Sequence, residues 1–215
     1  MPYRNTPFVE DEYYHLYNRG VEKRTIFLDA EDYGHFFRLL YICNSSKSIS
    51  LREVGRNFER GEPVVAIGLF CLMPNHFHLL AKQKIENGIS AFMKKLLTAY
   101  SMYFNKKYKR SGHLFEGVFR SKHMSSGRQL KYLYAYIHLN PAKLIDSGWK
   151  EKRTKTKKEL LDYVTKYSYS SMGEYLNSKN RAYGKDVLNL AEFPKCFNRP
   201  EDHVNELFDW LGFGE

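Results

Sequence analysis

Apolar side chains recur along the chain with two different spacings, and these spacings predict the order of its strands and helices. Runs rich in aromatic and β-branched residues predict strands at 13–18, 64–72, 76–81 and within 114–124. Apolar positions three and four residues apart predict helices at 29–41, 89–104 and 128–139, and the pattern also favours a short helix near 51–58. The order β-α-β-β-α-β-α therefore predicts an α+β fold, in which an antiparallel sheet carries its helices on one face.

The ends of these elements have recognisable signals. Asp29 can cap the first helix, and Pro74-Asn75 predicts a turn that joins two strands in a β-hairpin. Pro141 limits the third helix, because the residue before a proline disfavours helical geometry.

The pattern changes after Trp149. Residues 150–158 are rich in lysine and poor in apolar side chains, which indicates a linker or an exposed loop. Weak helical segments follow, including one at 159–167, and the chain ends in an amphipathic patch formed by Val204, Leu207, Phe208, Trp210 and Leu211. The sequence thus predicts a domain at 1–148 and a mostly helical extension at 149–215 that docks on it.

Charge is concentrated in one stretch of the chain. The 215 residues carry a net charge of +10, yet residues 94–160 alone hold 17 basic and 4 acidic side chains, a net charge of +13. Such a block is typical of proteins that bind polyanions. Aromatic residues alternate with the cations, for example at Tyr103, Tyr108 and Phe119, and bases of unpaired strands stack on such rings.

Composition excludes several other classes. The longest apolar run, 64–73, is too short to span a bilayer, and the first residues lack the pattern of a signal peptide, so no membrane partner is predicted. The three cysteines Cys43, Cys71 and Cys196 form neither a zinc pattern nor a disulfide framework. A reducing cytoplasm is the simplest location.

Two histidines in the third predicted strand are candidate metal ligands. Side chains alternate along a strand, so His76 and His78 share one face while Phe77 occupies the other. Two imidazoles on one face can converge on a divalent ion. For an isolated His-x-His the alternative is a pair of structural or surface histidines.

A second group of polar residues lies along the third predicted helix. Leu130, Leu133, Tyr134 and Ile137 form its apolar stripe, whereas Tyr132, Tyr136 and Asn140 follow one another at four-residue spacing on its flank. A tyrosine beside an amide can serve as a nucleophile and a metal ligand. Ordinary amphipathic packing is the alternative.

Together the two segments resemble the single-tyrosine HUH nucleases, and more narrowly the REP-associated tyrosine transposases, a domesticated branch of insertion-sequence transposases. The resembling stretches occur in family order: Tyr14-His15, Asn18-Arg19-Gly20, Ile26-Phe27, Met73-Pro74-Asn75-His76-Phe77-His78-Leu79-Leu80, Phe104 to Tyr108, Gly112 to Gly117, Phe119 to Lys122, and Tyr136-Ile137-His138-Leu139-Asn140-Pro141. The chain departs from the family after Pro141, where Ala142-Lys143-Leu144-Ile145 replaces the common Val-Arg-Ala-Gly.

This resemblance implies a fold, a reaction and a set of residues. The fold is the ferredoxin-like, RRM-like palm of these nucleases. The reaction is cleavage and rejoining of single-stranded DNA near hairpins through a 5′-phosphotyrosine, with Tyr136 as nucleophile and Tyr132 as second choice. His76, His78 and Asn140 match the ligands of Mg²⁺ or Mn²⁺. A cytoplasmic, nucleoid-associated monomer or homodimer is expected.

The remaining basic and histidine residues receive secondary roles. We expect DNA contacts from Arg120 and Lys122 near the last predicted strand, and from the basic end of the second helix at Lys106, Lys107 and Arg110. His15 is interpreted as structural. His138 lies roughly 200° around the helix from Tyr136 and is expected to face away from it.

Two other functions remain open from the residues alone. A non-catalytic module that binds single-stranded nucleic acid would also be basic and aromatic, but would need neither the histidines nor Tyr136. A metal-dependent phosphoesterase that uses water would need the histidines but not Tyr136.

Overall fold

The computed structural model describes residues 7–47, 60–176, 186–197 and 199–210 of the chain. The short helix expected near 51–58 lies outside the described residues. No helix among those described is both long enough and apolar enough to cross a membrane.

Four strands form a single sheet at the centre of the molecule. They are β1 (Tyr13–Arg19), β2 (Val65–Met73), β3 (His76–Gln83) and β4 (Arg120–His123), arranged in the order β2-β3-β1-β4 with every neighbouring pair antiparallel. This confirms the four predicted strands, including the β2–β3 hairpin, and the α+β ferredoxin-like arrangement.

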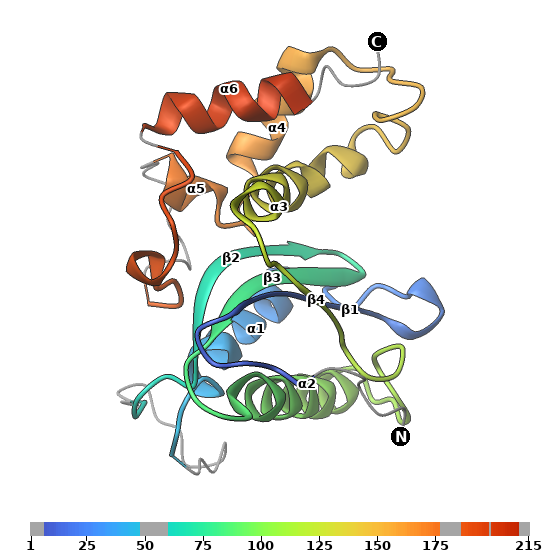
Figure 1. Cartoon of the computed structure of the whole chain (residues 1–215). Coiled ribbons are helices and arrows are strands. Elements are labelled where there is room, and N and C mark those ends of the chain that lie inside the picture. The colour runs from blue at the N-terminus through green and yellow to red at the C-terminus, as the bar shows by residue number, and fades with distance from the viewer. Residues whose placement is uncertain (1–6, 48–59, 177–185, 198, 211–215) are drawn as a thin grey trace.

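Helices cover both faces of the sheet, so the expectation that they pack on one face is wrong. Figure 1 shows α1 (Ala30–Ile42) and α2 (Gly88–Lys107) on one side and α3 (Gly127–Leu139) on the other. The reason lies in β2, all nine of whose residues are buried. A strand that is apolar on both faces needs a packed layer on each.

The helix ends follow the sequence signals. The Asp29 side chain accepts a hydrogen bond from the backbone N–H of Asp32, and Ser126 caps α3 in the same way. The predicted stripe of α3 is confirmed, because Leu130, Leu133, Tyr134 and Ile137 are all buried against the sheet. Past Leu139 the chain tightens into the 3₁₀ helix η2 (Asn140–Leu144), whose second residue is Pro141.

The C-terminal extension packs on α3 and along the outer edge of β2. It contains α4 (Lys157–Lys166), α5 (Met172–Tyr175), η3 (Leu190–Glu192) and α6 (Pro200–Trp210), while a short 3₁₀ turn, η1 (Val21–Lys23), lies outside the extension after β1. The amphipathic end docks as predicted, since Leu207 of α6 is fully buried with Ala135 and Leu139 of α3. Residues 169–171 run beside β2, where the backbone N–H of Leu72 donates to the Tyr169 carbonyl at 2.8 Å.

Ser171 of the extension forms hydrogen bonds with both β2 and α3, and this contact leads to a first testable prediction. Its hydroxyl lies 3.1 Å from the backbone nitrogen of Phe70 in β2 and 2.8 Å from Nε2 of His138 in α3. Ser171→Ala leaves buried polar groups unpaired, so we expect the free energy of unfolding in urea to fall by about 1–3 kcal/mol. Ser147→Ala, at an exposed position, is the control and should change it by less than about 0.5 kcal/mol. Equal effects of the two substitutions would contradict the predicted role.

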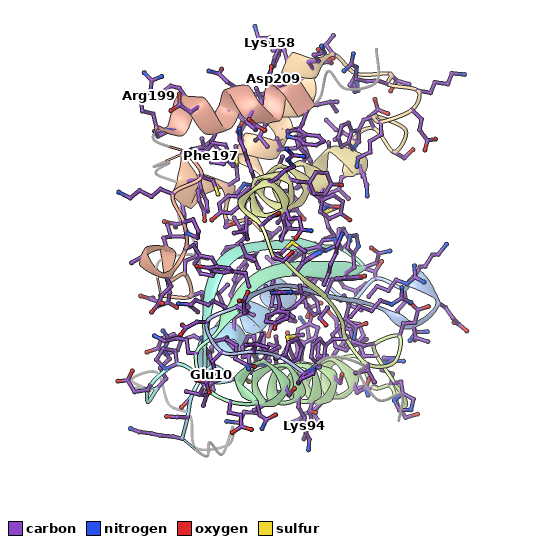
Figure 2. The ribbon with its side chains drawn as sticks, in the orientation of Figure 1. Glu10, Lys94, Lys158, Phe197, Arg199 and Asp209 are labelled. Carbon is purple, nitrogen blue, oxygen red and sulfur yellow. The ribbon has the colours of Figure 1, made fainter. Side chains whose placement is uncertain are left out.

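The basic block of the sequence does not form one surface. Figure 2 shows Lys94 on α2 at one end of the molecule and Lys158 at the opposite end, beyond the sheet and α3. The cations that matter for a site must therefore be identified from the structure rather than from the net charge of the segment.

Candidate active site

Strand register gathers polar side chains on the face of the sheet that α3 covers. His78 of β3 lies opposite Tyr17 of β1, and His76 lies opposite Arg19. On the other side of β1, Arg120 of β4 pairs with Tyr17. Directly opposed residues of antiparallel strands point to the same face. These side chains line a pocket of about 290 Å³, to which α3 contributes Tyr136.

Tyr136 approaches the histidines of its own chain. Its ring centroid lies 5.4 Å from that of His78 and 6.0 Å from that of His15. The side chain is half-buried, and burial raises the pKa of its phenol, although a hydrogen bond from Asn140 acts in the opposite direction. The phenol is thus protonated at neutral pH.

Three imidazoles form a connected group beneath Tyr136. Nε2 of His15 lies 2.9 Å from Nδ1 of His78, and Nδ1 of His76 lies 2.6 Å from the side-chain oxygen of Asn75. Burial lowers the pKa of His15 and of His76 to about 4, and holds the pKa of His78 well below its ordinary value. The rings are therefore neutral, and Nε2 of both His76 and His78 is left free of protein hydrogen bonds within the described chain.

His15 is the member of this group that sequence reasoning placed outside the site. The His-x-His spacing identifies two side chains on one strand, because alternation is a local property. His15 lies on a different strand, 63 residues away along the chain from His78. Only the register of β1 against β3 brings it into contact, and that register is not visible in the local pattern.

Asn140 follows Tyr136 by four residues and does not line the histidine pocket. It lines a neighbouring pocket that shares Tyr136 as a wall, and its Nδ2 donates to the backbone carbonyl of Tyr136 at 2.9 Å. Its Oδ1 is buried and has no hydrogen-bond partner in the part of the chain that the structure describes. Among those same residues, no three His, Cys, Asp or Glu side chains form a cluster able to hold a metal ion.

Comparison with known proteins identifies the family. The sequence model of the IS200-like transposases matches residues 9–140, well over half of the chain. The protein belongs to the IS200-like transposase family. The matched segment contains the whole histidine pocket and the helix that carries Tyr136.

One solved structure supports the fold of this IS200-like transposase. The protein is similar to a structure described as a REP-associated tyrosine transposase bound to a REP hairpin, with a TM-score of 0.52 and 14% sequence identity over 90% of this chain and 95% of that one. A second similar structure, from Deinococcus radiodurans R1, is described provisionally as a transposase; its TM-score is 0.38, and it shares 16% identity over 63% of this chain and 95% of that one. No curated protein matches the sequence.

The structure brings some of the predicted DNA contacts to the transposase site and not others. Arg120 lines the histidine pocket, and Lys122 lies opposite His15 on the same face of the sheet. Lys106 and Lys107 at the end of α2, and Arg110 just after it, lie on the opposite face. There, the Lys107 ammonium lies 2.9 Å from a carboxylate oxygen of each of Asp29, Glu31 and Asp32.

Arg110 is likewise held by its neighbours. Its guanidinium donates to the Asn105 side chain at 2.6 Å and to the His113 carbonyl at 3.3 Å. Contacts of DNA with Lys106, Lys107 and Arg110 therefore stay predictions that the geometry of the histidine pocket does not support.

An ion pair at the rim of the pocket was also not predicted from the sequence. The guanidinium of Arg19 binds both carboxylate oxygens of Glu116, with Nη2 and Oε1 2.9 Å apart. Arg19 holds the pKa of Glu116 below its ordinary value, so the carboxylate stays charged. Glu116 is the one acidic side chain in a lining that also contains Arg19, Lys23 and Arg120, which leaves the pocket electropositive.

His138 faces away from the site, as expected. It is fully buried, and its Nδ1 lies 2.8 Å from Nε2 of His203 in α6. Its role is to hold the extension against α3.

Proposed function

We propose that this protein cleaves and rejoins single-stranded DNA beside short hairpins through a covalent 5′-phosphotyrosine at Tyr136. The observation that carries the proposal is the position of Tyr136 against His78 and His15 in an electropositive pocket. Membership of the IS200-like transposases supports it, as does the similarity to a protein whose structure contains a REP hairpin.

The donor set suits a divalent metal ion. Nε2 of His76 and Nε2 of His78 face one pocket, and neither has a protein partner in the described chain. Oδ1 of Asn140, in the neighbouring pocket, is also buried without a partner, which is otherwise costly, and it is the atom that would complete a set of two nitrogens and one oxygen. The hydrogen bonds at the other imidazole nitrogens resemble those that orient metal-binding histidines. When bound, Mg²⁺ or Mn²⁺ would polarise a non-bridging oxygen of the scissile phosphate.

Tyr136 supplies the nucleophile in this proposal. Its phenolic oxygen forms a bond to phosphorus while the bond from phosphorus to the 3′ oxygen breaks. The phenol gives up its proton, and the departing 3′ oxygen gains one, so a free 3′-hydroxyl and a tyrosine linked to the 5′ phosphate result. Because one phosphodiester, between tyrosine and the 5′ end, replaces another, the reverse attack by a 3′-hydroxyl rejoins DNA without another source of energy.

Cations around the pocket would hold the DNA backbone. Arg120 and Lys122 lie on the exposed edge strand β4, and Arg19 and Lys23 border the same pocket. Each phosphate that a cation neutralises makes binding more sensitive to salt. Since every proposed side chain comes from one chain, we infer that a monomer can hold a complete site, while a homodimer is the other possibility.

The test is a search for the covalent adduct. The protein is incubated with end-labelled hairpin DNA that carries single-stranded flanks, with Mn²⁺, and the products are separated on a denaturing gel. We expect a labelled protein–DNA species that protease digestion removes. Binding without cleavage would favour the non-catalytic module, and cleavage without an adduct would favour a phosphoesterase that uses water.

His15 gives a prediction about positioning. Because His15 orients His78, we expect His15→Leu to weaken Mn²⁺ binding, measured by calorimetry, about 10- to 100-fold. His15→Gln, which keeps a hydrogen-bonding side chain, should recover part of the affinity. His113→Leu, at an exposed position outside the pocket, is the control and should leave it unchanged. Unaltered Mn²⁺ affinity in His15→Leu would show that the contact is only structural.

A further inference from the structure

A second pocket shares Tyr136 with the histidine pocket. It encloses about 120 Å³ between α3, η2 and the C-terminal extension. Tyr132, Tyr136 and Asn140 come from α3 and η2, whereas Trp149, Lys150 and Trp210 come from the extension. Figure 1 shows how α6 lies across α3 to make this possible. The family model ends at residue 140, so the part contributed by the extension lies beyond it.

Aromatic rings make up much of this pocket. The rings of Tyr132 and Trp210 meet edge to face with their centroids 5.1 Å apart, and the ring of Tyr132 is stacked on that of Tyr136 at 6.0 Å. Tyr132 is 44% exposed, although it is a large aromatic side chain. Exposed rings at a polyanion site are the surfaces on which nucleobases stack.

Two lysines complete the pocket, and no acidic side chain lines it. Nζ of Lys150 lies 5.4 Å from the ring centroid of Tyr136 and 5.3 Å from that of Trp149. Burial and the charge of Lys150 both lower the pKa of Lys143. Among the described residues, neither lysine forms an ion pair with a carboxylate, so an anion that bound between them would relieve their repulsion.

One hydrogen-bond donor in the lining also lacks a partner. The indole nitrogen of Trp149 is buried and makes no hydrogen bond to any described residue, although the side chain is only 7% exposed. Buried donors of this kind are rare and call for an acceptor. A ring nitrogen or carbonyl oxygen of a base would provide one.

We infer that this pocket binds one nucleobase of the single strand next to the phosphodiester that Tyr136 attacks, with the neighbouring phosphate on Lys143 and Lys150. Its volume of about 120 Å³ is of the same order as the roughly 150 Å³ of an engineered protein cavity that binds one benzene ring, so the pocket suits one base better than a whole nucleotide. The inference rests on the proposed function, and it assigns the extension a part in holding the substrate.

The test measures binding separately from cleavage. Hairpin oligonucleotides with single-stranded flanks carry the fluorescent base 2-aminopurine at each flank position in turn, and they are bound to the Tyr136→Phe protein, which leaves the DNA intact. We expect stacking to quench the fluorescence at one position. Adding Trp210→Ala should remove that quenching and weaken binding about 5- to 100-fold.

A matched control separates this effect from loss of structure. Phe208→Ala removes another exposed ring of α6 that lies outside the pocket, and it should leave both the quenching and the affinity unchanged. Lys150→Gln offers a second variant that spares the apolar packing: it should lower the salt dependence of binding by about one released ion, whereas Lys152→Gln should not. The helix content of each variant is checked by circular dichroism.

The results distinguish this inference from the proposed function. If no flank position is quenched, or if Trp210→Ala and Lys150→Gln bind as tightly as their controls, the base pocket is wrong even where the wild-type protein forms the covalent adduct. If the Trp210→Ala effect appears but the wild-type protein forms no adduct, the pocket stands as a binding site for single-stranded DNA and the proposed cleavage is wrong.

Discussion

Tyr136→Phe is expected to abolish the covalent protein–DNA adduct, with the rate of its formation reduced at least about 1,000-fold. Phenylalanine keeps the ring that contacts His15 and His78 but lacks the only oxygen that could attack phosphorus from this position. Because the ring is retained, the affinity for the hairpin DNA should change by less than about threefold. Adduct formation is measured on a denaturing gel, and affinity by fluorescence anisotropy.

Tyr132→Phe is the matched control for this result. Tyr132 lies one helical turn before Tyr136, with the two ring centroids 6.0 Å apart, and it shares the same flank of α3. It does not line the histidine pocket, so its hydroxyl should be dispensable for cleavage. A Tyr136→Phe protein that still formed the adduct, with activity lost in Tyr132→Phe, would move the nucleophile to Tyr132.

His78→Ala is expected to reduce adduct formation by about 1,000-fold and to abolish tight Mn²⁺ binding. Metal polarisation of a phosphoryl oxygen contributes several kcal/mol to the transition state, and each 1.36 kcal/mol corresponds to a factor of ten in rate. His78 is the more central of the two histidines, since it contacts both His15 and the ring of Tyr136. Cleavage rates are measured over a range of Mn²⁺ concentrations, alongside calorimetric titration of the ion.

The Mn²⁺ titration decides what the substitution has removed. If His78 is a ligand, the concentration of Mn²⁺ that gives half-maximal cleavage should rise strongly in the variant, whereas His113→Ala should leave it unchanged. If His78→Ala lowered the rate while the variant still bound Mn²⁺ like the wild type, the proposed ligand set would be wrong. The thermal unfolding temperature of both variants is recorded, because His78 is buried and its loss leaves a cavity.

The C-terminal extension contributes both to the edge of the sheet and to a pocket beside Tyr136. Its residues 169–171 satisfy backbone groups of β2, which would otherwise be an open strand edge. The extension also contributes Trp149, Lys150 and Trp210 to the second pocket that Tyr136 borders. Tyr136, the proposed nucleophile, thus borders two pockets: the histidine pocket on the sheet and the pocket that the extension helps to form.

Local chemistry explains what could be predicted from the sequence. The spacing of apolar residues and the capping residues were enough to predict the four strands and α1 to α3. Alternation along a strand placed His76 and His78 on one face. Each of these features depends only on residues within one turn or one strand. The same reasoning identified the buried stripe of α3 and left Tyr136 on its flank. The resemblance to the transposases then supplied the chemistry, and the family model bears out the family.

The four strands, the helices α1 to α3 and the family could be read from the amino-acid sequence. Which of these elements pack against one another could be seen only in the folded protein. The tertiary structure placed helices on both faces of the sheet, brought His15 to His78, paired Arg19 with Glu116, and carried Trp210 to Tyr132. These contacts join residues that lie far apart along the chain, and they depend on strand register and helix packing, which are set by burial of the whole core rather than by any local pattern.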